Sequence, residues 1–181
     1  MEDTRKRQAI IKKLNKIYKK GYMPEREKEK YSELHAEVVN CFGHACFNLS
    51  NKILDEFALH QADLMDFFRN FNGFGIHNYF KESVNRIEKV GLKINVSSLK
   101  EPVKKNQWKI AYYVMNNIFS GSDLHFMIQA KDGKWYSKLG KNPGVEVFDK
   151  LPKVFHGKYK LSGIYKITNP YAKLEEDNME M

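Results

Sequence analysis

The chain has 181 residues and a mass of 21.3 kDa, a size that fits one domain better than two. Hydrophobic residues make up 42% of it and aromatic residues 13%, which is enough apolar surface to build a core and excludes a globally disordered chain. The net charge is +9, and with a mean hydropathy of −0.61 no stretch is long and apolar enough to predict a membrane span.

The first segment, residues 1–22, reads as a basic amphipathic helix. Its apolar side chains recur at helical spacing and its lysines lie elsewhere; the apolar positions are Ile10, Leu14, Ile17 and Tyr18. This stripe predicts docking onto the rest of the fold, and the segment holds no candidate catalytic group. No apolar core of a Sec-type signal peptide follows Met1, so we expect cytoplasmic synthesis, with non-Sec export left open.

More helices are predicted before residue 91. A polar connector leads into a short helix over about 25–38, and a new helix is expected to start at Cys41 or Phe42 because Asn40 is a good N-cap. Its apolar positions recur at three- and four-residue steps as far as Ile53. Two further helices are expected, over 61–70 and over about 78–90.

The second half predicts an antiparallel sheet, because the hydrophobic period changes to two. The expected strands are 92–97, 108–114, 123–130, 134–139, 145–148 and 159–167. Asp132-Gly133 is read as a two-residue hairpin turn. We therefore predict an α+β domain over residues 23–172, a helical layer packed on a C-terminal sheet, followed by a frayed acidic tail over 173–181.

Cys41 and His125 are the candidate catalytic residues. A cysteine at the start of a helix lies among unpaired backbone N–H groups that favour negative charge, which predicts a lowered thiol pKa. A histidine at the start of a strand could serve as its general base. The alternative for Cys41 is a small buried apolar residue, and Asn40 either caps the helix or donates to an oxyanion.

At these residues the chain resembles a poorly characterised group of bacterial and phage proteins with a papain-like cysteine peptidase fold. The matching pieces are Asn40-Cys41-Phe42 with Ala45, Asp123-Leu124-His125-Phe126 with Gln129, and Asp132-Gly133-Lys134-Trp135 with Lys138 and Gly140. The resemblance implies that Cys41 is a nucleophile and His125 its general base. The residues after Gly140 fit less well, so the resemblance names no third catalytic residue.

Hairpin geometry suggests where that third residue lies. With Asp132-Gly133 as a two-residue turn, His125 is predicted to lie opposite Gly140. Asn142 is then the nearest polar side chain that could accept a hydrogen bond from the imidazole, and Asp149 at the end of the next strand is the alternative. A dyad without a third residue also stays open.

Other chemistries are disfavoured. Cys41, His44 and Cys46 diverge on one helix without a second ligand cluster, so we predict neither a metal site nor a disulfide. No glycine-rich phosphate loop is present, and no cofactor is predicted.

The prediction is a thiol-dependent hydrolase or acyl-transfer enzyme, a cysteine peptidase, amidase or deamidase acting on a protein or peptide. The alternatives are a catalytically inactive interaction domain of the same fold and a basic nucleic-acid-binding module; steep salt dependence of binding would mark the module. Nucleic acid is not the favoured partner because the positive charge is mostly lysine and is scattered. The oligomeric state is not predicted.

Overall fold

The computed structural model describes residues 2–21, 30–59, 64, 67, 76–117 and 121–172. Helices occupy its first half: α1 (Glu2–Lys19), α2 (Glu33–Val38), α3 (Cys41–Cys46), α4 (Asn51–Glu56) and α6 (Ile76–Lys89). Strands follow: β1 (Lys93–Val96), β2 (Gln107–Asn117), β3 (Gly121–Gln129), β4 (Trp135–Lys138), β5 (Val145–Phe148), β6 (Val154–Phe155) and β7 (Tyr159–Thr168). The predicted α+β class is confirmed, and the expected helix over 61–70 and tail over 173–181 lie mostly or wholly outside the described residues.

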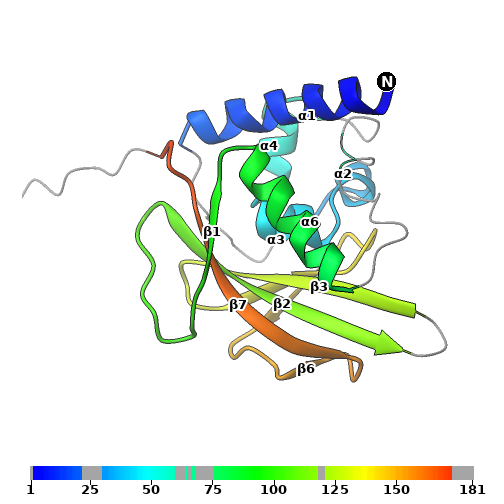
Figure 1. The fold of residues 1–181 in the computed structure, drawn as a ribbon, viewed down its shortest axis with the longest axis vertical. Coiled ribbons are helices and arrows are strands. Elements are labelled where there is room, and N and C mark those ends of the chain that lie inside the picture. The colour runs from blue at the N-terminus through cyan, green and yellow to red at the C-terminus, as the bar shows by residue number, and fades with distance from the viewer. Residues whose placement is uncertain are drawn as a thin grey trace, which may run out of the picture.

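One antiparallel sheet holds all the strands, in the order β1-β7-β2-β3-β4-β5 with β6 paired to β7 (Figure 1). The helices lie on one face of this sheet, as Figure 1 shows. Side chains alternate between the faces along each strand. Ile110, Tyr112 and Phe126 belong to the main core beneath the helices, whereas Tyr113 and Met127 belong to a second apolar cluster on the opposite face.

Helix α1 is part of the main core. The predicted stripe is buried as a unit, with Leu14 and Ile17 fully inaccessible to solvent. None of the helices in the described ranges is long and apolar enough to cross a membrane.

The helix that begins at Cys41 is shorter than predicted. It ends at Cys46 because Asn48 adopts a left-handed conformation (φ 49°), and α4 then starts with the Ser50 side chain accepting from the Ile53 N–H. Leu49 therefore lies in the connection between two short helices and Ile53 in the second of them, and both side chains are still buried in the main core.

The hairpin between β3 and β4 differs from the prediction by one residue. Its loop has three residues, 131–133, with Gly133 in the left-handed region (φ 81°) and the Ala130 N–H donating to the Lys134 carbonyl. Met127 consequently pairs with Ser137, and the same register extended would set His125 opposite Leu139 instead of Gly140. A one-residue shift changes which side chains share a face.

Candidate functional site

Cys41 is the first residue of α3, and this helix is held against the sheet. The Asn40 side-chain oxygen accepts from the Gly43 N–H at 3.0 Å, so it caps the helix. On the other side, the Trp108 indole of β2 donates to the Ala45 carbonyl at 3.0 Å, and both residues are buried. Cap and indole together fix where α3 places its first residue.

The Cys41 sulfur lies beside β3. Backbone N–H groups of Phe126 and Phe42 lower its pKa, as does Lys138, while burial and the Asp123 carboxylate raise it. Burial is the largest effect and raises the pKa to about 11. The lowered pKa expected from a helix start is therefore not found, because α3 is only six residues long and desolvation of the sulfur outweighs its N–H groups.

Cys46 is enclosed within the main core, and burial raises the pKa of its thiol well above the usual value. Both cysteines are free thiols. Within the described ranges no cluster of histidine, cysteine and acidic side chains could hold a metal ion. Cys46 is thus an apolar packing residue and a natural control for experiments on Cys41.

His125 lies in β3 and is 4% exposed. Its ring stacks on Phe155 with centroids 4.6 Å apart, and its Nε2 lies 2.8 Å from the Ser137 hydroxyl of β4. Burial, followed by the electrostatic interaction with His156, lowers the pKa of His125 to about 3. The imidazole is therefore neutral at physiological pH.

The Cys41 side chain and the His125 ring lie on different sides of β3. The backbone N–H of Phe126 faces the sulfur, and the Phe126 side chain belongs to the main core, whereas the His125 ring lies on the opposite face with Phe155. Strand β4 pairs with β3 only over residues 127–129, so β3 has no β4 partner beside His125 and Phe126. The two side chains make no hydrogen bond, ring contact or electrostatic interaction with each other among the contacts of the described residues.

Neither predicted third residue contacts His125. Asn142 accepts from the Gly144 N–H within its own loop, and Asp149 is an exposed partner of Lys134. The three-residue hairpin loop instead brings Ser137 onto the face of His125. Ser137 was missed from the sequence because the predicted register of β3 against β4 was wrong by one residue. A three-residue loop would have placed Ser137 on the same face as His125.

Replacing Ser137 with alanine should change the protonation geometry of His125. We expect the ¹⁵N resonance of His125 Nε2 to move, because the hydroxyl partner is removed, while Asn142→Ala leaves it in place. Heteronuclear NMR of the histidine rings measures this directly. Equal spectra for Ser137→Ala and wild type would rule out Ser137 as the residue that orients the imidazole.

Three more polar residues surround Cys41. Lys138, at the end of β4, is fully buried and electrostatically coupled to the thiol. Asp123 accepts a hydrogen bond of 2.6 Å from the Tyr159 hydroxyl, and burial, followed by this contact, raises the pKa of the phenol. From the sequence, Lys138 is named only as one residue of the matching motif, and no role is predicted for it.

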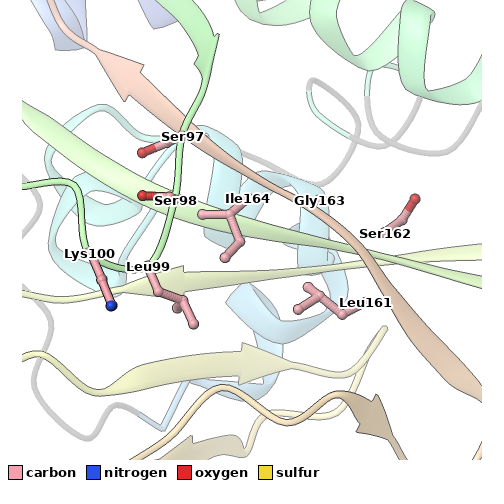
Figure 2. Close-up of a pocket in the computed structure, with 8 residues that line it drawn as sticks. All are labelled: Ser97, Ser98, Leu99, Lys100, Leu161, Ser162, Gly163 and Ile164. Atoms are coloured by element: carbon pink, nitrogen blue, oxygen red, sulfur yellow. The ribbon is translucent and has the colours of Figure 1, made fainter.

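A hollow of about 500 Å³ lies elsewhere in the fold (Figure 2). It lies along the middle of β7, because β6 pairs with β7 only at residues 159–160 and β1 pairs with β7 only at residues 165–168. Its lining residues are Ser97, Ser98, Leu99, Lys100, Leu161, Ser162, Gly163 and Ile164. None of the candidate catalytic residues is among them.

Comparisons with protein-family models, with curated proteins and with solved structures found no match to this chain.

Proposed function

We propose that the protein is a thiol-dependent acyl-transfer enzyme of papain-like type, with Cys41 as nucleophile and a protein or peptide as substrate. The observation that carries this proposal is the position of the Cys41 sulfur beside the part of β3 that is not paired with β4, against the N–H of Phe126 and one residue from a buried, neutral histidine. Structural cysteines in a core, such as Cys46, have no such polar surroundings.

The roles follow from the hydrogen bonds. When His125 Nε2 donates to the Ser137 oxygen, the other ring nitrogen carries a lone pair and can accept a proton. Cys41 Sγ attacks the substrate carbonyl carbon, a sulfur–carbon bond forms, and the thiol proton passes to His125. Among the described residues these two side chains do not interact, so this step requires them to come within reach when substrate binds. An imidazolium of low pKa is a strong acid and gives that proton to the leaving amine or alkoxide as its bond to the carbonyl carbon breaks. Water then hydrolyses the thioester and restores the thiol.

The test uses p-nitrophenyl acetate, an ester that acylates thiols. We expect wild type to release p-nitrophenolate in a stoichiometric burst followed by turnover, and peptide mapping by mass spectrometry to find the acetyl group on Cys41. The expected loss of turnover is at least about 100-fold in Cys41→Ala, since the covalent route is removed.

Cys46→Ala is the matched control, a second thiol removed from the same helix, and it should retain the burst. Circular dichroism verifies that both variants are folded. Turnover that survives in Cys41→Ala, or an adduct carried by Cys46 or surface lysines alone, would refute the proposal and favour an inactive interaction domain.

A further inference from the structure

Lys138 is a buried cation, and burying its charge costs free energy that a purely structural residue would not need to spend. Its side chain is 0% exposed, and burial lowers its pKa to about 8. Removing an ammonium from water costs several kcal/mol unless a counter-charge compensates it. Within the described ranges no carboxylate forms an ion pair with it; Glu37, which raises its pKa from a distance, pairs instead with Lys141 at 2.9 Å.

The Lys138 nitrogen is held by two backbone carbonyls. It donates to Ala36 of α2 at 3.2 Å and to Gly140 after β4 at 2.6 Å, and it lies 5.3 Å from the centre of the Tyr31 ring. A neutral amine has two N–H bonds, which match these two acceptors. The two carbonyls therefore satisfy a neutral amine fully, whereas the third proton of the ammonium has no hydrogen-bond acceptor among the described residues.

Lys138 and Cys41 share the helix-covered side of the sheet. Tyr136, two residues before Lys138, belongs to the main core, and so do the residues next to Cys41 in α3. The coupling is mutual: Lys138 lowers the pKa of the thiol, and Cys41 raises the pKa of the lysine. No other cation has a comparable effect on this sulfur among the described residues.

We propose that Lys138 is the counter-ion of the Cys41 thiolate, a positioning residue that governs the protonation of the nucleophile. The claim rests on the proposed function, which makes Cys41 the nucleophile. At a pH below its pKa of about 8 the Lys138 side chain is mostly an ammonium, so its positive charge acts on the sulfur when the thiol proton leaves for His125. Lys138 itself takes no proton from the thiol in this scheme.

Among the described residues, the other titratable groups that act on this pair are all acidic. Three of them are electrostatically coupled to Cys41: Asp123, Tyr159, which donates a hydrogen bond to Asp123, and Cys46. Glu37 is the acidic group besides Cys41 that acts on Lys138. Asp123 opposes the thiolate and Lys138 favours it, so removing the lysine leaves the opposing charge unbalanced.

The experiment measures the rate of iodoacetamide alkylation of Cys41 against pH, with each cysteine followed separately by mass spectrometry. In Lys138→Met we expect the midpoint of the Cys41 profile to rise by about one pH unit or more, which slows alkylation about tenfold at pH 8. In Lys138→Arg, which keeps the charge, the midpoint should stay close to wild type. An unchanged midpoint in folded Lys138→Met would overturn the proposal and make the lysine structural.

A second measurement covers the case in which Lys138→Met does not fold. Coupling is reciprocal, so Cys41→Ala must lower the pKa of Lys138, read from the ¹³Cε and ¹⁵Nζ shifts of that lysine. An unchanged lysine pKa in Cys41→Ala also overturns the proposal. Neither measurement uses turnover: ester hydrolysis that fails while the coupling holds would reject the enzyme and leave the ion pair intact.

Discussion

Leu14→Ala in α1 should destabilise the protein by about 2–5 kcal/mol, because the side chain is fully buried in the main core and its loss leaves a cavity. Urea unfolding followed by circular dichroism measures the free energy of unfolding. The effect should extend to Cys41, which packs against the same core.

Leu34→Ala is the control for this prediction. The same side chain is removed from α2, where it is 62% exposed, and the expected change is within about 0.5 kcal/mol. Equal effects of the two variants would contradict the assignment of α1 to the core.

Acidification should unfold wild type more steeply than a His125→Gln variant. The folded-state pKa of about 3 lies below the ordinary value of 6.5, so the unfolded chain binds the extra proton between these values. The stability associated with the neutral ring is fully present above pH 6.5 and is lost as pH falls toward 3. The loss amounts to several kcal/mol, since one pKa unit corresponds to about 1.4 kcal/mol.

Urea midpoints for both proteins at pH 7, 5.5 and 4.5 measure this difference. The carboxylates titrate in both, so their contribution cancels when the two curves are subtracted. Parallel curves would show that His125 is not buried as a neutral ring.

Local patterns predicted the elements well. The stripe of α1, the cap at Asn40 and the alternation in the strands depend on neighbours within a few residues, and each agrees with the structure. Alternation also holds along β2, where Trp108, Ile110 and Tyr112, at every second position, all belong to the main core.

The site was harder to predict because it depends on register and burial. One extra loop residue brings Ser137, not Asn142, to the imidazole. The raised pKa of Cys41 follows from burial of its sulfur, and the Phe126 N–H that partly offsets this rise is far away in sequence. Likewise, nothing local to Lys138 shows that Ala36, 102 positions earlier, accepts its hydrogen bond.

The order of strands has a consequence for how the protein folds as it is synthesised. Strand β2 lies between β3, which follows it directly, and β7, which begins at residue 159. Until β7 leaves the ribosome, the long edge of β2 that includes Trp108 and Ile110 has no strand partner among the strands described here, and such open edges pair readily with other chains. We therefore expect truncated nascent chains that stop before residue 159 to require chaperones, and full-length chains to be released from them as β7 docks.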